Sequence, residues 1–425
     1  MDEYFLQYLW NFQKFDAPNL QLVDGVSLTV FKTGFQNHDS GPDFLEAQLK
    51  LDELTWSGSV EIHYKSSDWK RHGHSTDRAY DNVILHVVWE HDCEIEINGK
   101  AIPTFEMKHF VSTGIEQSYR HYINQPQTIR CTQTISEINE IHIHGMLDKA
   151  LAARLQQKGR KVTEILKDTD GDWEETAYRV ICRNFGFKTN DEAFRRLAES
   201  LPYHILRKYH QKEDQVFALI FGMAGYLEKM DDEYQSKLRS EFDYLVPKHG
   251  LSPNLMRHHW KHGKMRPANF PSIRLAQFAT FIAHSKQIFA HLLNIADIKS
   301  AQVFLNPGLP AYWQTHYDFN KPSTRHYRLG KSSINTIIIN SIVPILTAYA
   351  KYLDEVKYLE QASQILENLS AESNHIINQW KSVNITPSNA ADSQALIFQY
   401  NELCKKKKCL RCNIGVSILN KTFAS

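Results

Sequence analysis

The sequence contains no long uninterrupted apolar run. Its longest candidate, residues 334–350, is broken by Asn335, Asn340 and Pro344, whereas a membrane-spanning helix needs about 20 consecutive apolar residues. The first residues, Met1-Asp2-Glu3-Tyr4, lack the basic region and apolar core of a signal peptide. We therefore expect a cytoplasmic protein with no membrane partner, in which residues 334–350 form a buried helix.

The chain also has little cysteine and almost no net charge. Six cysteines in 425 residues do not make a disulfide framework, and the sequence shows no fixed-period repeat. Lys+Arg 49 against Asp+Glu 48 gives a formal charge of +1, so any basic surface for nucleic acid must be local. The hydrophobic content of 42% is enough to fill the cores of two or three domains.

The first 110 residues change from helical to strand periodicity. Residues 3–14 carry apolar side chains at helical spacing, and residues 26–31, 44–51 and 57–64 alternate like strands. A helix capped by Asp68 is predicted to run to about Tyr80, followed by a central strand at 83–89. Asn98-Gly99 then predicts a hairpin between residues 93–97 and 101–107. The predicted order is helix, three strands, helix, strand, hairpin.

From about residue 135 the pattern is helical. Helices are predicted at 146–166, 173–185, 192–201, 215–230, 234–244, 273–284, 288–295, 334–352, 356–366 and 390–404. Breaker-rich segments at 264–271 and 306–310 separate them into groups. We predict an α+β N-terminal domain followed by a mostly α-helical C-terminal region. The expected domains are 1–132, 133–305 and 306–425, the last ending in a Cys-rich segment.

Two acids are predicted to stand on neighbouring strands. Asp43 follows a Ser-Gly-Pro turn, and Glu61, His63 and Lys65 alternate along the next strand, so these three share one face. Mg²⁺ is typically bound by one or two protein carboxylates together with water and phosphate oxygens. We predict a Mg²⁺ or Mn²⁺ site at Asp43 and Glu61, with His63 and Lys65 as further catalytic residues.

The face on which Asp43 lies depends on where its strand begins. Counted from Asp43, the side chains of the same parity are Leu45, Ala47 and Leu49, which form the apolar face. Asp43 therefore reaches the polar face only if the turn ends at or after it. The alternative is that Glu61 and His63 line a solvated sheet face and Asp43 only follows the turn.

The order of these elements, with Pro-Asp before the second strand and Glu61-Ile62-His63 in the third, resembles the restriction-endonuclease-like fold of the PD-(D/E)XK nuclease superfamily. The resemblance covers about residues 1–110. It implies a mixed sheet flanked by helices, hydrolysis of phosphodiester bonds in DNA or RNA, and metal ligation by Asp43 and Glu61. The sequence departs from that motif because His63 stands at the usual lysine position and Lys65 follows two residues later.

The same resemblance implies accessory positions outside the acid pair. Glu3 or Gln7 in the first helix, and Gln48 after the aspartate, correspond to them. His72, His74 and His86 could add metal ligands or an acid–base group. However, His72 and His74 are two residues apart on a predicted helix and should not share a face, and His86 in a buried strand is typical of a hydrogen-bonded core residue.

Three cysteines lie close together near the end of the chain. Cys404, Cys409 and Cys412 supply thiolates at a spacing that suits one Zn²⁺ ion or an iron–sulfur cluster. A closed site needs a fourth ligand, for which Cys131, Cys182 and His375 are candidates. The alternative is a set of reduced cysteines that follow a helix.

Basic residues recur in the helical part, interleaved with aromatic side chains. This pattern suits contact with phosphates and stacking on bases, although ordinary solvated helix ends give the same pattern. The predicted nucleic-acid-binding residues are Arg257, Lys261, Lys264, Arg266, Arg274 and Arg328.

Several sequence segments along the chain resemble an uncharacterised bacterial family that is catalogued as a domain of unknown function, the 2851 family. They include residues 37–44, 58–63, 84–88 and 266–271 and the closing Cys-rich segment. The resemblance covers nearly the full length and implies no activity. Three hypotheses remain open: a metal-dependent nuclease-like protein, a non-catalytic nucleic-acid-binding or scaffold protein on the same fold, and a small-substrate metallohydrolase.

Overall fold

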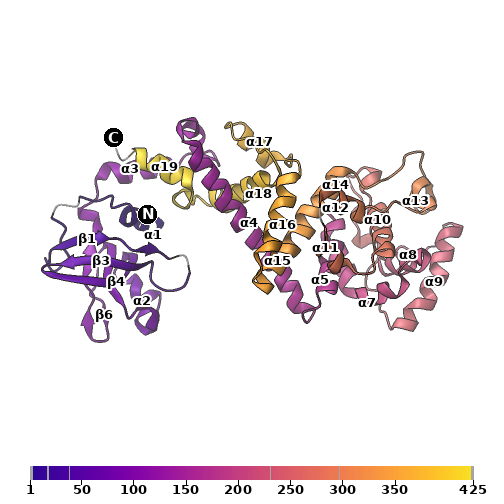
Figure 1. Cartoon of the computed structure of the whole chain (residues 1–425), viewed down its shortest axis with the longest axis horizontal. Coiled ribbons are helices and arrows are strands. Elements are labelled where there is room, and N and C mark those ends of the chain that lie inside the picture. The colour runs from indigo at the N-terminus through magenta and orange to yellow at the C-terminus, as the bar shows by residue number, and fades with distance from the viewer. Residues whose placement is uncertain (1–2, 17–18, 38, 230, 296, 423–425) are drawn as a thin grey trace. The chain divides into compact units, whose positions relative to one another are not determined.

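The computed structural model describes residues 3–16, 19–37, 39–229, 231–295 and 297–422. The chain forms two compact units, of which the first contains residues 1–146 and 400–425 and the second residues 147–399 (Figure 1). The boundary expected at residues 305 and 306 falls inside the second unit. The Cys-rich segment belongs to the first unit, because its residues pack against the N-terminal region.

The first unit is built on a mixed sheet. Its elements begin with α1 (Glu3–Asn11), β1 (Leu28–Lys32), β2 (Phe35–Gln36), β3 (Phe44–Leu51) and β4 (Leu54–Lys65), and continue with α2 (Asp68–Arg71), β5 (Val83–Glu90) and β8 (Thr104–Glu106). The strand order is β1-β3-β4-β5-β8, and β2 also pairs with β3. The β1–β3 and β3–β4 pairs are antiparallel, whereas β4–β5 and β5–β8 are parallel. The predicted α+β class is confirmed.

Burial explains why β4 and β5 form the centre of the sheet. Residues 59–63 of β4 and 83–88 of β5 are buried without a polar face exposed to solvent, as expected for strands covered on both sides. Helices α1 and α2 both pack against β4 (Figure 1), and α1 buries Phe5, Leu6 and Leu9. The polar side chains at residues 59–63 of β4 are therefore largely excluded from solvent.

The predicted hairpin is only partly formed. Strands β6 (Glu96–Ile97) and β7 (Lys100–Ala101) pair across Asn98 and Gly99, whose φ angles of 52° and 74° suit a two-residue hairpin turn. The expected second arm does not continue to residue 107, because residues 104–106 pair in parallel with β5 instead.

The helix predicted from Asp68 to Tyr80 is wrong beyond its first turn. Helix α2 ends at Arg71, and Gly73 adopts a left-handed conformation with φ +78°. Two short 3₁₀ turns, 74–76 and 78–80, follow. The physical reason is Gly73, since a left-handed residue ends the helical hydrogen-bond ladder and turns the chain.

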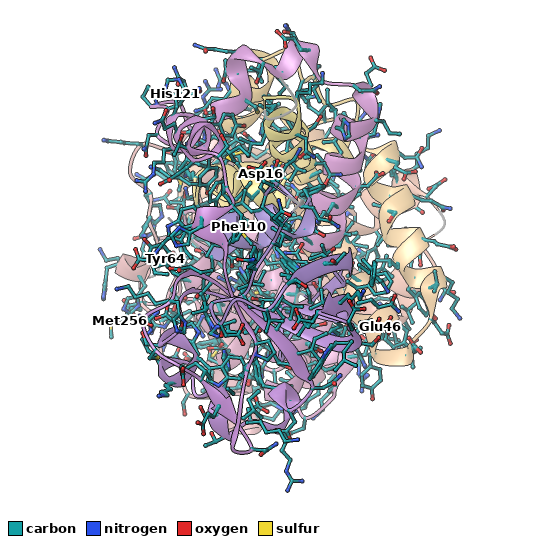
Figure 2. The ribbon with its side chains drawn as sticks, turned by 90° about the vertical axis from the view of Figure 1, so that its left-hand side faces the viewer. Asp16, Glu46, Tyr64, Phe110, His121 and Met256 are labelled. Atoms are coloured by element: carbon teal, nitrogen blue, oxygen red, sulfur yellow. The ribbon has the colours of Figure 1, made fainter. Side chains whose placement is uncertain are left out.

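A β-bulge in β3 removes the parity problem at Asp43. Phe44 pairs with Val60, but the next pair joins Ala47 to Gly58, and Glu46 at φ +57° lies in the bulge (labelled in Figure 2). Leu45 is exposed, whereas Phe44 and Ala47 are buried. The extra residue shifts the alternation of the strand, so Asp43 is not on the apolar face.

The remaining elements of the first unit are helical. Helix α3 is Thr113–Ile123, α4 (Glu140–Asp168) enters the second unit at Leu147, and α19 is Asn413–Thr422. Tyr8 of α1 donates a hydrogen bond to Asn420 of α19 over 2.7 Å. Helix α19 therefore lies beside α1.

The second unit is helical and buries a continuous apolar core. Its helices are α5 (Trp173–Phe185), α6 (Asp191–Ser200), α7 (Tyr203–Leu206), α8 (Glu213–Met223), α9 (Glu233–His249), α10 (Pro271–His284), α11 (Ile288–Leu293), α12 (Ile298–Leu305), α13 (Ala311–Thr315), α14 (Lys331–Ile337), α15 (Val343–Leu353), α16 (Val356–Asn368), α17 (His375–Lys381) and α18 (Ala390–Phe398), with β9 (His316–Asp318) and β10 (Lys321–Pro322). The predicted helical C-terminal region is confirmed, although Met230, where one predicted helix ends, lies outside the described residues.

One segment of the second unit has the length and composition of a membrane span. Residues 331–353 form α14, a π-helical turn at 338–342 and α15, with a mean hydropathy of 1.4 over the most apolar window. Of that window, 78% is buried inside the structure. The segment is therefore a core helix of this unit, as the sequence predicts.

Candidate functional site

The hairpin of β3 and β4 brings Asp43 and Glu61 together. Asp43 directly precedes the Phe44–Val60 pair, so Glu61 lies opposite it. The Asp43 backbone N–H donates to Glu61 Oε2 over 3.0 Å, and the Ile62 N–H donates to Asp43 Oδ2 over 3.1 Å. Gln7 of α1 donates to the other Asp43 oxygen over 2.8 Å. The structure therefore places Asp43 and Glu61 in direct contact.

Burial makes this acid pair costly to ionise. It raises the pKa of Asp43 to about 8, and the negative charge of Glu61 adds to the effect. Burial also raises the pKa of Glu61 to about 8, with a further contribution from Glu3 of α1. Carboxylates in such a position are stabilised by a cation, so the donor set fits a divalent metal.

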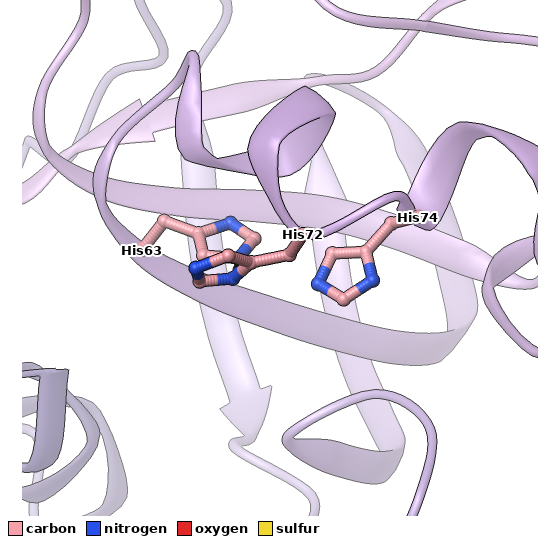
Figure 3. Close-up of side chains that lie close together, drawn as sticks. All are labelled: His63, His72 and His74. Atoms are coloured by element: carbon pink, nitrogen blue, oxygen red, sulfur yellow. Dashed lines mark hydrogen bonds between the residues drawn. The ribbon is translucent and has the colours of Figure 1, made fainter.

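Three imidazoles lie beside the acid pair. His63 of β4 and His72 and His74, which flank Gly73, form a group whose ligand nitrogens all lie within 4.8 Å of one another (Figure 3). His63 Nε2 is 3.1 Å from His72 Nδ1, and its Nδ1 is 2.9 Å from Nε2 of His86. The expectation that His72 and His74 should not share a face is wrong, because the chain turns at Gly73.

Glu61 joins the imidazoles to the acid pair. Its Oε1 lies 3.2 Å from His74 Nε2 and 3.5 Å from His63 Nε2. We call Asp43, Glu61, His63, His72 and His74 the acid–histidine site. Burial lowers the pKa of His63 to about 2, and the other histidines lower it further. The His63 ring is therefore neutral, which is the form that binds a metal or accepts a proton, and burial also lowers the pKa of His74.

His86 supports this site from the neighbouring strand β5. Burial lowers its pKa to about 3, and its ring packs against the Trp69 ring in a T-shaped arrangement with the centroids 5.2 Å apart. Its Nδ1 has no hydrogen-bond partner within the described residues. The contact with His63 agrees with the expected core histidine and fixes the orientation of the His63 ring.

A family model matches residues 3–375 of the chain. The chain belongs to the family described as a protein of unknown function, DUF2851. The DUF2851 match contains all of the acid–histidine site and Cys131, and it ends before Cys404. No curated protein and no solved structure matches the chain.

Gly73 offers a direct test of how the histidines are placed. We expect Gly73→Ala to destabilise the first unit by about 1 kcal/mol, because an L-residue is strained at φ +78°. No neighbouring atom lies within 4 Å of the added methyl group, so the effect is conformational. Gly73→Asn should lose less, since asparagine tolerates this conformation better. Thermal unfolding of both variants and of the unsubstituted protein measures these differences. A melting temperature of Gly73→Ala equal to that of the unsubstituted protein would contradict the explanation.

Two residues predicted from the motif lie outside the site. Lys65 is half-exposed and forms an ion pair with Glu90 over 3.6 Å, because it lies two residues beyond the buried part of β4. Gln48 is exposed on β3 and pairs with Ser57, four residues before Glu61. Glu3 and Gln7, in contrast, both act on the acid pair.

The clustered cysteines gain a fourth partner from the same unit. Cys131, Cys404, Cys409 and Cys412 are each at least 91% buried, with exposures of 7%, 8%, 9% and 9%. We call them the thiol group. Arg130, next to Cys131, donates to the carbonyl oxygen of Cys404 over 2.8 Å. The other two candidates lie in the second unit, where Cys182 donates to the Phe194 carbonyl over 3.3 Å.

The four thiols act on one another electrostatically. Burial raises the pKa of Cys131, Cys404 and Cys409, and in each case a neighbouring cysteine raises it further. For Cys409 the pKa is raised to about 12. In the described part of the chain, no three of these cysteines have sulfurs within 4.8 Å of one another. The group is close but more widely spaced than the ligands of a single zinc ion, which lie about 3.8 Å apart.

The six predicted nucleic-acid-binding residues all lie in the second unit. Arg257 pairs with Asp318 and stacks over the Tyr226 ring at 4.8 Å. Arg274 is buried, whereas Lys261, Lys264 and Arg266 are exposed. The remaining residue, Arg328, is also exposed. Arg274 therefore differs from the other predicted cations in being buried.

Proposed function

We propose that the chain is a metal-dependent hydrolase of phosphodiester bonds in DNA or RNA, acting at the acid–histidine site. The observation that carries the proposal is the acid pair, in which the carboxyl groups of Asp43 and Glu61, both with raised pKa values, lie next to each other and beside three imidazoles. Such perturbed groups concentrate at catalytic sites. A bound Mg²⁺ or Mn²⁺ ion would polarise the phosphate and lower the pKa of water.

The chain's own residues would divide the work as follows. Asp43 and Glu61 would hold the metal, and Gln7 and the Ile62 N–H orient the Asp43 carboxylate. His63 stands where the superfamily motif usually has lysine, and its neutral ring suits the transfer of a proton to or from the water. Glu3 is a third carboxyl group near the acid pair, and burial raises its pKa as well.

The restriction-endonuclease-like fold belongs to the same proposal. Apart from the two-residue strand β2, the succession α1, β1, β3, β4, α2 and β5 follows the order that the resemblance implies, with Asp43 directly before β3 and Glu61 within β4. Glu3 and Gln7 in α1 lie at the site, as the accessory positions require. These features support the likeness, while His63 in place of lysine distinguishes this chain.

The test is a cleavage assay on single- and double-stranded DNA and RNA with purified protein. We expect cleavage with Mg²⁺ or Mn²⁺ and none with EDTA. Binding of nucleic acid without cleavage under any metal would favour the non-catalytic reading. Hydrolysis of a small phosphodiester such as bis-p-nitrophenyl phosphate, with no cleavage of polymers, would favour a small-substrate metallohydrolase, which the three-imidazole group also supports.

We further propose that the thiol group holds a structural metal. Four buried thiols from two distant parts of the sequence fit a Cys₄ donor set. Their spacing favours an iron–sulfur cluster over a single Zn²⁺ ion, because a cluster holds its ligands further apart. Tyr122 also donates a hydrogen bond to the Cys409 sulfur, which would help to fix that ligand.

Replacing Cys131 tests whether the fourth ligand is assigned correctly. Cys131→Ser should reduce the bound metal as strongly as Cys409→Ser, since each removes one of four ligands. Cys182→Ser is the matched control, because Cys182 is also buried but lies in the second unit. Elemental analysis of anaerobically purified protein measures zinc and iron. Absence of both metals from the unsubstituted protein would end the proposal.

A further inference from the structure

A buried arginine in the second unit has only neutral partners. Arg274 of α10 is 6% exposed. It donates to Gln277 over 3.0 Å, to Asn269 over 2.7 Å and to Ser333 over 3.3 Å. Its guanidinium group lies over the Phe187 ring, 4.3 Å from the centroid. None of these groups carries a negative charge.

The charge of Arg274 is therefore not balanced locally. Burial lowers its pKa to about 10, and no ion pair in the described residues involves it. Its Nε is buried and has no hydrogen-bond partner within the described part of the chain. A buried cation of this kind is expensive unless an anion accompanies it.

Arg274 lines a cavity that suits an anion. The cavity has a volume of about 560 Å³, within the range of about 300–1,000 Å³ that is usual for ligand sites. Two further cations, Lys264 and Arg266, line it, together with the hydroxyl groups of Thr189, Ser332 and Thr336. No residue lining the cavity is an aspartate or glutamate.

We propose that this cavity binds the phosphate group of a small phosphorylated molecule. Three cations complement a dianion, and the arginine fork and neighbouring hydroxyls provide directional donors to phosphate oxygens. The limited volume favours a ligand of small-molecule size. The inference is independent of hydrolysis at the acid–histidine site, since every residue used lies in the second unit.

A purely structural role for Arg274 makes a different prediction. Its bonds to Asn269 and Ser333 tie the region before α10 to α14, and that role does not involve the exposed cations Lys264 and Arg266. Replacing these two should therefore change ligand binding only if the cavity is a site. Their exposure also makes such a variant compatible with folding.

The experiment is calorimetric titration of the full chain with inorganic phosphate, AMP and a single-stranded oligonucleotide. We expect phosphate and AMP to bind and K264A/R266A to weaken both by about tenfold or more, because two charge-assisted contacts are lost. K321A/R325A is the matched control, since it removes two exposed cations of the same unit that do not line the cavity. R274K, which keeps the charge but loses the fork, should also weaken binding.

The outcomes separate the alternatives. Unchanged binding by K264A/R266A, or no binding of phosphate and AMP, overturns the proposal. Binding of the oligonucleotide alone, sensitive to K264A/R266A, would also overturn it and assign the cavity to a polynucleotide surface. Equal weakening by K321A/R325A would show only a general effect of charge and would count against the site.

Discussion

Asp43→Asn and Glu61→Gln are each expected to lower metal-dependent cleavage by about 10³-fold or more, because each removes a charge that stabilises the metal, which itself supplies several kcal/mol of transition-state stabilisation. Both substitutions keep the side-chain size and leave an oxygen to accept the Ile62 and Asp43 N–H groups. The measurement is the initial rate of polymer cleavage in Mg²⁺ and Mn²⁺.

The control for this prediction is Glu53→Gln. Glu53 lies in the turn between the same two strands, but its side chain is 94% exposed. Its replacement should leave the rate unchanged. If D43N or E61Q retained full activity while remaining folded, the acid pair would not be the catalytic centre, whatever activity the protein has.

Metal binding and pH should together control the stability of the first unit. The pKa values of Asp43 and Glu61 rise from 3.8 and 4.5 to about 8 on folding. The folded state therefore binds more protons between these values, and stability falls with rising pH by about 1.4 kcal/mol per unit for each carboxyl group. The pKa values of His63 and His86 are lowered on folding. Below pH 6.5 the unfolded state therefore binds more protons at these two residues, and their contribution to stability rises with pH.

Between pH 4.5 and 6.5 the carboxyl groups lower the stability with rising pH while the histidines raise it. From pH 6.5 to about 8 the effect of Asp43 and Glu61 is no longer opposed by His63 and His86. We expect the metal-free protein to lose thermal stability from pH 6.5 to 8. Mn²⁺ should restore it, and by more at pH 8, because the ion replaces the two protons. Differential scanning calorimetry at both pH values measures this.

The D43N/E61Q double variant separates this linkage from the rest of the chain. Its melting temperature should depend less on pH above 6.5 and should not respond to Mn²⁺, since neither side chain ionises. Glu53→Gln should behave like the unsubstituted protein. An equal Mn²⁺ response in the double variant would place metal binding elsewhere.

Local pattern was sufficient to predict most elements of the first unit. The alternation of residues 44–51 and the apolar run at 83–89 predicted β3 and β5, and the same pattern predicted that Asp43 and Glu61 lie at neighbouring strands. These predictions succeed because the order of apolar and polar side chains along a short segment indicates both the secondary structure and the buried face.

The histidine part of the site depended on backbone conformations that pattern alone does not fix. The left-handed Gly73 brings His72 and His74 to His63, and the bulge at Glu46 reverses the face assigned to Asp43. A glycine between two histidines was the available signal. The placement of Arg130 and Cys131 beside the clustered cysteines depends on contacts between residues more than 270 positions apart. Periodicity along the sequence carries no information on such pairs.

The return of residues 400–425 to the first unit has a consequence for biosynthesis. The second unit is an insertion within the first, so a nascent chain must complete residues 147–399 before the thiol group can assemble. Domains that are contiguous in sequence can fold as they emerge from the ribosome, but the thiol group of this unit can form only after Cys412 has been synthesised.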